Sequence, residues 1–462
     1  MIHEDLLSGL LKKALSNGGD FADIFVEKRN STALQLEDSI IEKVTSGTIA
    51  GVGIRVIKSG KTAYAYTNDF SEKVLMDMAA TVSRAAEEGA REPMAFIKSR
   101  PVKADIKVDP LSVPSSLKIK LVKAADAAAR QTDSRIRQVS VTCRDMRQNV
   151  LIASSDGTYC KDERVYVLGL VHAVASDAEV IQTGYETAGG LTGFELFEEY
   201  SIERMAETAA RRAVMMLSAQ RAPGGRMPVV ISSEAGGTMI HEAIGHGLEA
   251  DLVRSGLSVY SGKLGQQVAS RLITVIDDAT IARARGSYSF DDEGTPAQKN
   301  VLVSSGMLKG FMYDKLSASL DSAVSTGNGR RESFHYRPIS RMSNTYIAPG
   351  ESSPENVVKS VPNGLFVKKI GGGQVNTVNG DFVFEVQEGY LIKNGSICEP
   401  VRGATLIGNG PDALMSIDMV GSDLGFAIGT CGKDGQGVPV SDAMPTLRIP
   451  ELVVGGEIKG RR

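Results

Sequence analysis

Two of the five histidines in this chain of 462 residues lie beside a carboxylate, in the stretch His241-Glu242-Ala243-Ile244-Gly245-His246. Neutral imidazoles bind zinc or iron, and a carboxylate next to such a ligand can take a proton from a water that the metal activates. These residue types indicate a metal-dependent hydrolase, with His241 and His246 as ligands and Glu242 as general base. The alternative is that both histidines are satisfied core or capping residues and that Glu242 is a solvated carboxylate.

The two histidines are five residues apart, whereas the commoner His-Glu-x-x-His motif sets them four apart. At roughly 100° per residue, a regular helix would place them about 140° apart, and the two rings would not converge on one ion. We therefore expect the helical turn to be widened or broken between them. Gly245 and Gly247 lie where the backbone would have to depart from regular helical geometry.

A hydrolytic metal site needs a third protein ligand, and the residues leave three candidates. Glu249 is the obvious one by local spacing, because it lies three residues beyond His246. Asp251 is another. Cys431 lies in a glycine-dense segment, which lets the backbone approach a site closely, and a thiolate binds zinc well. A lone cysteine is more often an inert small apolar residue, so spacing alone does not choose among them.

The elements that must position these side chains follow from hydrophobic periodicity and turn residues. Helical spacing predicts helices over 5–17, 71–90, 115–131 and 202–217. Short alternating runs predict antiparallel strands over 23–68 and 135–176. After a linker at 221–228, we expect a buried strand at 229–231, a motif helix over 238–249, and strands at 271–276, 307–312, 381–386 and 389–393. The predicted fold class is α+β with two domains. Residues 1–222 would pack helices on an antiparallel sheet, and residues 223–462 would form a predominantly antiparallel β domain that carries the metal-site helix.

Composition excludes several classes of protein. Apolar residues make up 42% of the chain and charged residues 23%, as in ordinary soluble globular proteins. The net charge of −3 provides no basic stripe for nucleic acid. The N-terminus is acidic, and no signal peptide or membrane span is visible, so we expect a cytoplasmic protein. The four cysteines are scattered, which is not typical of a disulfide framework.

Four segments together resemble a known family. They are His241 to Asp251, Asp291-Asp292-Glu293-Gly294-Thr295-Pro296, Gly327 to Ser333 and Gly429 to Gln436. Over essentially the whole chain, the sequence resembles the TldD branch of the TldD/PmbA (TldD/TldE) metalloprotease family. The partner TldE/PmbA type lacks the His-Glu-x-x-x-His motif, which is intact in this chain.

The resemblance implies a site and an activity. His241, His246 and Cys431 would hold the metal, zinc first and iron second, and Glu242 would act in catalysis. Glu249 would then hold a histidine ring by its other nitrogen. The implied protein is a cytoplasmic metalloprotease that cleaves peptides or unfolded segments with low sequence specificity. It would work as a homodimer or with a TldE/PmbA-like subunit, without direct nucleic-acid or membrane contact. Two alternatives stay open: a hydrolase with Cys431 as nucleophile, and a non-catalytic regulator of the gyrase-modulator type.

Other polar stretches carry weaker hypotheses. The run Asp291-Asp292-Glu293 has the residue types of an acidic metal site, but the Gly-Thr-Pro that follows favours a turn or a substrate-facing loop. Arg330 and Arg331 have the chemistry to hold a substrate carboxylate, and equally to form structural ion pairs. His335 is a candidate proton donor that does not map onto a family motif.

Overall fold

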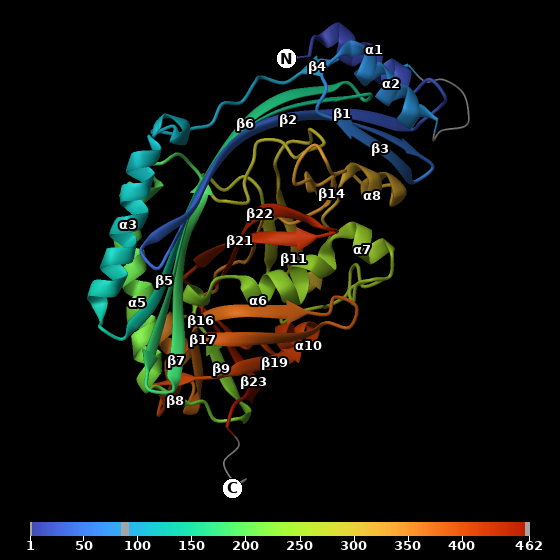
Figure 1. The fold of residues 1–462 in the computed structure, drawn as a ribbon. Coiled ribbons are helices and arrows are strands. Elements are labelled where there is room, and N and C mark those ends of the chain that lie inside the picture. Colours follow the sequence, from blue (N-terminus) through green and yellow to red (C-terminus); the bar gives the residue numbers. More distant parts are fainter. Residues whose placement is uncertain (1, 85–91, 458–462) are drawn as a thin grey trace.

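The computed structural model describes residues 2–84 and 92–457 (Figure 1). Its first half forms one seven-stranded sheet, in the order β3-β2-β1-β5-β6-β4 with β7 paired to β6. This N-terminal sheet arches over the rest of the molecule, and its helices lie on the outer side of the arch. The elements of this half are α1 (Glu4–Ala14), β1 (Phe21–Glu37), β2 (Ile40–Lys58), β3 (Lys61–Thr67), α2 (Glu72–Ser83), β4 (Ile97–Lys98), η1 (Pro110–Ser112), α3 (Ser115–Thr132), β5 (Ile136–Ser154), β6 (Thr158–Asp177), β7 (Val180–Leu191), α4 (Leu196–Glu199) and α5 (Ile202–Ser218).

Two apolar clusters hold the helices on this sheet. The leucines of α1 and the apolar face of α2 pack against β1 and β2, and α3 and α5 pack against β5, β6 and β7. The helices that the periodicity predicts are therefore present. The end of the helix predicted over 71–90, residues 85–90, lies outside the described residues.

The C-terminal part contains an eight-stranded sheet (β16-β9-β23-β19-β17-β18-β8, with β20 on β23), a six-stranded sheet (β12-β11-β10-β15-β22-β21) and the pair β13–β14. Most of their pairings are antiparallel, and β15–β22, β9–β16 and β8–β18 are parallel. The mixed α+β class is confirmed. The elements are β8 (Gln220–Arg221), β9 (Gly225–Ile231), η2 (Ser233–Ala235), α6 (Thr238–Ile240), η3 (His241–Gly245), η4 (His246–Leu248), α7 (Ala250–Arg254), β10 (Val275–Asp278), β11 (Lys299–Ser304), β12 (Met307–Leu308), α8 (Lys315–Leu320), β13 (Gly329–Arg330), β14 (Ile339–Ser340), β15 (Asn344–Ile347), α9 (Pro354–Lys359), β16 (Asn363–Val375), β17 (Asp381–Lys393), β18 (Ser396–Arg402), β19 (Thr405–Asn409), α10 (Gly410–Ser416), β20 (Met419–Val420), β21 (Gly425–Lys433), β22 (Gln436–Met444) and β23 (Leu447–Gly455).

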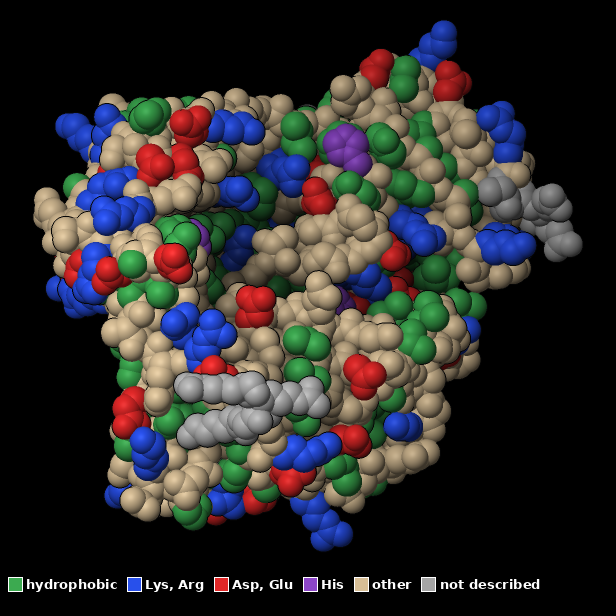
Figure 2. Space-filling model, turned by 60° about the horizontal axis from the view of Figure 1, so that its bottom comes forward, with side chains coloured by type: hydrophobic (Ala, Val, Ile, Leu, Met, Phe, Trp, Pro, Cys, Tyr) green, Lys and Arg blue, Asp and Glu red, His purple; other side chains and the backbone are tan. Residues whose placement is uncertain are grey.

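The motif segment crosses between the two larger C-terminal sheets (Figure 1). α6 contacts β15, β16 and β22, and η3 contacts β15, β16 and β17, so the segment is held from both sides by the largest apolar cluster. On another face the molecule is hollowed near its middle, and lysine and arginine side chains lie around the hollow (Figure 2). Among the described helices, none is both long enough and apolar enough to cross a membrane.

Several element boundaries differ from the prediction. The strand expected at 271–276 begins only at Val275, and that expected at 307–312 is confined to Met307–Leu308. The predicted linker at 221–228 is partly wrong, because β9 begins at Gly225 and pairs with β23. Cross-strand pairing overrides the turn preference of the glycines and Pro228 there. The domain boundary at 222 and 223 stays a prediction.

Candidate metal centre

The helix predicted over 238–249 is not regular. A single α-helical turn, Thr238–Ile240, is followed by the π-helical turn His241–Gly245 and the 3-10 turn His246–Leu248. A π turn bonds residue i to residue i+5, so residues five apart come to lie on one side. The centroids of the two histidine rings are 4.9 Å apart. The distortion that the spacing requires is thus confirmed.

The two glycines contribute close packing rather than unusual backbone angles. Gly245 has an ordinary helical conformation, with φ −53° and ψ −60°. A Cβ at Gly245 would collide with Met342 Sδ, and one at Gly247 would lie 2.6 Å from the ring of Tyr260. Tyr260 also donates a hydrogen bond of 3.0 Å from its hydroxyl to the carbonyl oxygen of Ala243. Met342 and Tyr260 therefore pack directly against the widened turn, which is possible only because residues 245 and 247 are glycines.

Cys431 joins the two histidines from a distant part of the chain. It lies on β21, and its Sγ is 3.5 Å from His246 Nε2. One ligand atom from each of His241, His246 and Cys431 lies within 4.8 Å of the other two. We call these three residues the His–His–Cys cluster. The structure brings together the three residues that the resemblance implies as ligands, and neither Glu249 nor Asp251 belongs to this group.

Each histidine ring is held by a carboxylate at the nitrogen that faces away from the cluster. Asp442 Oδ1 lies 2.7 Å from His241 Nδ1, and Glu249 Oε2 lies 2.9 Å from His246 Nδ1. Such contacts fix the ring and leave Nε2 to bind a metal. Two imidazole nitrogens and one thiolate suit zinc, and iron is compatible. The donor set therefore fits the metal that the resemblance implies. Asp442 was not identified from the sequence.

Glu249 is fully buried and has cations of its own. Lys433 Nζ lies 3.1 Å from Glu249 Oε2 and 2.7 Å from Asp251 Oδ1, and Arg341 Nε is 3.9 Å from Glu249 Oε1. Although burial acts to raise the pKa of Glu249, Lys433 and His246 lower it to about 2. The carboxylate that orients His246 is therefore kept ionised.

The cluster is strongly coupled electrostatically. Burial acts to raise the pKa of Cys431, but the two histidines hold it down at about 5. Burial acts to lower the pKa of both rings. Asp442 nevertheless raises that of His241 well above its usual value, and Glu249 and Cys431 raise that of His246 to about 9. The thiolate and the two rings together form a metal-binding donor set, and a cation that binds there would replace the protons on the ring nitrogens.

Glu242 is half-buried beside this cluster. Burial raises the pKa of its carboxyl, whereas His241 and His246 act to lower it, so it lies within electrostatic reach of both rings. A carboxylate whose pKa is raised toward neutrality is better matched to taking up and returning a proton than an exposed one.

The other residues singled out in the sequence lie elsewhere. Asp292 and Glu293 join Asp23, Arg55, Arg164 and Arg331 in a buried group that links the N-terminal sheet to the C-terminal part, which we call the arginine–carboxylate network. The predicted turn over Asp291 to Pro296 is present, since Asp291 accepts hydrogen bonds from the backbone of Glu293 and Thr295. Its acidic residues are buried, whereas Pro296 is exposed.

Arg330 and Arg331 are both buried, and their guanidinium groups already donate hydrogen bonds within the protein. Arg330 donates to the carbonyl oxygens of Met342 and Pro439, and Arg331 donates to that of Asp292. Neither is placed to hold a substrate carboxylate. His335 is exposed and packs against Phe334 and Tyr66 outside the His–His–Cys cluster.

The sequence matches three sections of one family along most of its length. These are the PmbA/TldA metallopeptidase domain 1 over residues 22–89, the central domain over 108–217 and the C-terminal domain over 224–456. The chain is 39% identical to a metalloprotease TldD homolog of Haemophilus influenzae, covering 95% of this chain and 93% of that protein. It is 27% identical to a zinc metalloprotease TldD homolog of Saccharolobus solfataricus, covering 97% and 99%.

A solved structure has the same fold. A protein from Thermotoga maritima, whose proposed role is that of a modulator of a DNA gyrase, superposes on this chain with a TM-score of 0.81. The superposition covers 98% of this chain and 99% of that one. The two sequences are 24% identical. At that level of identity the similarity establishes the fold alone.

Proposed function

The chain belongs to the PmbA/TldA metallopeptidase family, and from that premise we propose that it is a metal-dependent peptidase with low sequence specificity. The observation that supports this most strongly is the convergence of His241, His246 and Cys431, with a carboxylate behind each ring. We propose zinc as the metal, because two nitrogens and one sulfur are typical zinc donors, and iron as the second choice.

The residues around the cluster have separate roles in this proposal. When bound, the metal supplies a Lewis acid that polarises the peptide carbonyl. Glu242 takes the proton from the attacking water and returns it to the leaving amine. Asp442 and Glu249 hold the two rings in the tautomer that presents Nε2 to the cluster.

The edge of β21 offers a place for an extended substrate. Thr430 pairs with Pro439, which has no N–H, so the backbone groups of Thr430 point away from β22. β21 ends its sheet, and Thr430 is exposed next to Cys431. A peptide that adds to this edge would be recognised by its main chain, which suits a protease with little sequence preference.

Replacing Glu242 by glutamine tests the base directly. We expect Glu242→Gln to keep its metal, by elemental analysis, and to lose at least about a hundredfold in kcat on an unfolded peptide. Glu234→Gln, at a nearby exposed carboxylate, is the matched control and should retain activity. Full activity of Glu242→Gln would refute the base assignment.

The third ligand is tested by metal content. We expect Cys431→Ser to lose most of its metal, whereas Cys398→Ser, at a free cysteine outside the cluster, should keep it. Unchanged occupancy in Cys431→Ser would return Glu249 or Asp251 to the ligand set.

One observation favours a second candidate function. The depressed pKa of Cys431, about 5 between two histidines, is also a property of nucleophilic cysteines. The two candidates separate cleanly: a metallopeptidase is inactivated by a chelator and restored by metal, whereas a cysteine hydrolase resists the chelator.

The assembly and the location remain proposals. We propose that the active form is a homodimer or a complex with a TldE/PmbA-like subunit, in the cytoplasm. Native mass and peptidase activity, measured for the chain alone and after mixing with such a subunit, distinguish the two assemblies. A fully active monomer would exclude both.

A further inference from the structure

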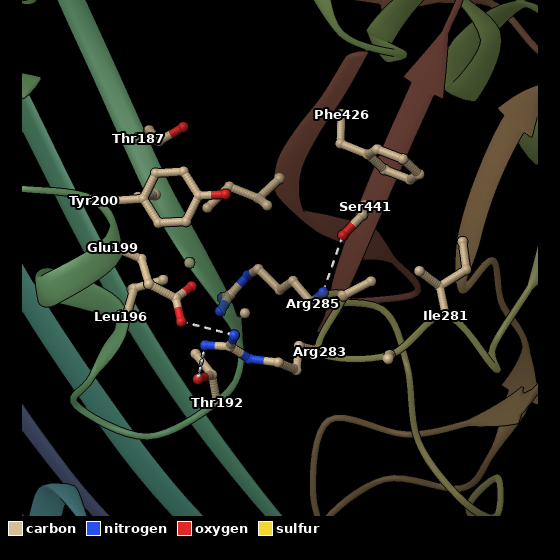
Figure 3. Close-up of a pocket in the computed structure, with 16 residues that line it drawn as sticks. Thr187, Thr192, Leu196, Glu199, Tyr200, Ile281, Arg283, Arg285, Phe426 and Ser441 are labelled. Carbon is tan, nitrogen blue, oxygen red and sulfur yellow. Dashed lines mark hydrogen bonds and ion pairs between the residues drawn. The ribbon is translucent and has the colours of Figure 1, made fainter. Parts of the chain in front are cut away.

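A cavity of about 380 Å³ lies between the N-terminal sheet and the strand that carries Cys431. One wall is the end of β7 together with α4, and the other is formed by the loop 281–285 with β21 and β22. Figure 3 shows two arginines, Arg283 and Arg285, reaching into it beneath the ring of Tyr200, with Phe426 on the opposite wall. The cavity therefore combines two guanidinium groups with aromatic surface.

Arg285 is the unusual member of this pair. Its Nε donates a hydrogen bond of 3.3 Å to the carbonyl oxygen of Gly429, and its backbone N–H donates one to Ser441 Oγ. Among the described residues no carboxylate pairs with it. Partial burial and the neighbouring cations Arg144 and Arg330 lower its pKa. A half-enclosed cation with cationic neighbours is stabilised by an anion that enters the cavity.

Arg283 is held by contacts across the cavity to the wall formed by β7 and α4. Its NH1 lies 2.8 Å from Glu199 Oε1 and its NH2 lies 2.9 Å from Thr192 Oγ1. Its backbone has φ +61°, a left-handed conformation that is unfavourable for a non-glycine residue, and its carbonyl oxygen accepts a hydrogen bond from Leu191 N. The loop thus holds Arg283 with its charge already compensated, and Arg285 as a cation that no carboxylate within residues 2–84 and 92–457 pairs with.

The cavity lies beside the first half of β21, before Cys431 along the strand. Phe426 and Ile428 line it, and Gly429, whose carbonyl Arg285 contacts, is two residues from Cys431. β7 also ends its sheet, and its Gly189 lies against Ile428. A peptide that pairs antiparallel to β21 across Cys431 would therefore direct its C-terminal end toward the cavity.

We propose that this cavity is a carboxylate-binding subsite in which Arg285 receives the C-terminal carboxylate of a bound peptide. The fork of a guanidinium matches a carboxylate in a bidentate fashion, and Tyr200 and Phe426 accommodate the last side chain. The proposal rests on the proposed function for its substrate. Its consequence is that the enzyme prefers peptides with a free C-terminus a few residues beyond the scissile bond.

The test uses three short peptides of one sequence with a fluorophore and a quencher. One ends in a carboxylate, one in a carboxamide, and one in a carboxamide with glutamate as its last residue. For the metal-loaded wild-type protein we expect kcat/KM to be roughly tenfold to a hundredfold higher for the acid than for the plain amide. If the glutamate peptide matches the acid, a side-chain carboxylate also serves; if it matches the amide, only the terminus does.

The variant Arg285→Gln should remove this preference. We expect kcat/KM for the acid peptide to fall to that for the amide peptide. The value of kcat/KM for the amide peptide should stay as in the wild type. Arg285→Lys, which keeps the charge without the fork, should retain part of the preference. Arg211→Gln removes an exposed arginine on α5 and is the control. Equal rates on acid and amide in the wild type, or equal losses on both in Arg285→Gln, would overturn the proposal.

Equilibrium binding separates this proposal from the proposed function. Fluorescence anisotropy with labelled acid and amide peptides is measured on the wild type and on Glu242→Gln. Tighter binding of the acid that Arg285→Gln abolishes, without cleavage of any peptide, would support the subsite and refute the peptidase. Cleavage of both peptides with no difference in binding would support the peptidase and refute the subsite.

Discussion

The His–His–Cys cluster and the arginine–carboxylate network are both buried groups of ionisable side chains, yet their atoms are paired differently. In the network each arginine reaches a carboxylate of another segment: Arg55 contacts both Asp23 and Glu293, and Arg164 contacts Asp292. In the cluster the carboxylates stand behind the rings, and the remaining donor atoms of His241, His246 and Cys431 face one another.

The difference shows how a buried polar group is recognised as a site. A network whose cations and anions neutralise each other joins two parts of the chain and has no donor set left to bind a metal. A group of imidazole and thiolate donors, oriented from outside and converging at one point, has its remaining capacity directed at a ligand. Charge and burial alone do not distinguish the two.

Replacing Arg55 by methionine should give the largest effect on folding. It would leave the buried carboxylates of Asp23 and Glu293 without the guanidinium between them, and we expect the free energy of unfolding to fall by about 3–5 kcal/mol in urea titrations. The exposed pair of Arg211 and Glu207 supplies the control, where Arg211→Met should cost about 0.5 kcal/mol or less.

The same variant tests the separation of the two groups. Metal per folded Arg55→Met chain, measured below the unfolding transition, should equal that of the wild type. Loss of metal at unchanged stability would show that the network supports the cluster rather than the joint between the two parts.

Replacing Asp442 by asparagine should have the converse effect. The side chain keeps its size but no longer holds His241 Nδ1 as a charged acceptor, and we expect metal affinity to weaken about 10- to 100-fold in competition with a chelator. Stability of the chain should change little. The control is Asp418→Asn, which removes a partly exposed carboxylate paired with Arg448. Undiminished affinity in Asp442→Asn would mean that the carboxylate does not orient the ligand.

The sequence anticipates the cluster better than it anticipates the residues behind it. The five-residue spacing of the histidines predicts the widened turn, because only such a turn brings the rings together. Cys431 follows from the family resemblance and not from spacing. Asp442 had a usable signal: the Asp434-Gly435 turn sets the register of the β21–β22 hairpin, which pairs Cys431 with Val438 and puts Asp442 on the same face.

The network illustrates what the sequence could not provide. Arg331 and Asp292 look alike as structural or substrate-binding residues until their burial is known, and that burial comes from segments about 310 and 130 residues away, on β1 and β6. The predicted boundaries of the linker near residue 225 and of the strand near residue 275 were wrong for the same reason, because pairing across a sheet overrides local preference.

The buried carboxylate of Glu195 sharpens the comparison because backbone groups hold it. It accepts hydrogen bonds from the N–H groups of Lys107, Val108 and Gly193. Burial acts to raise the pKa of Glu195, but these donors lower it to about 2. Since this folded pKa lies below the unfolded value of about 4.3, ionised Glu195 stabilises the protein above pH 4.

We expect Glu195→Gln to lose about 1–2 kcal/mol of unfolding free energy at pH 7. The difference from the wild type should shrink as the pH falls from about 4 toward 2, where the native carboxylate takes up its proton. Urea unfolding at several pH values measures this, with the exposed Glu198→Gln as control. A difference that does not depend on pH would assign the effect to shape rather than to charge.

His335 should give the smallest effect, because it belongs to neither group. Its ring is exposed, packs 4.0 Å from the Phe334 ring centroid, and lies 3.1 Å from Ser333 Oγ. Because the ring is exposed, its contacts with Phe334 and Tyr66 contribute little, so His335→Ala should change the unfolding free energy by less than about 1 kcal/mol. Peptidase activity and metal content should be unchanged, because the described contacts of His335 do not reach the cluster. Loss of activity with full metal content would show instead that His335 delivers a proton during turnover.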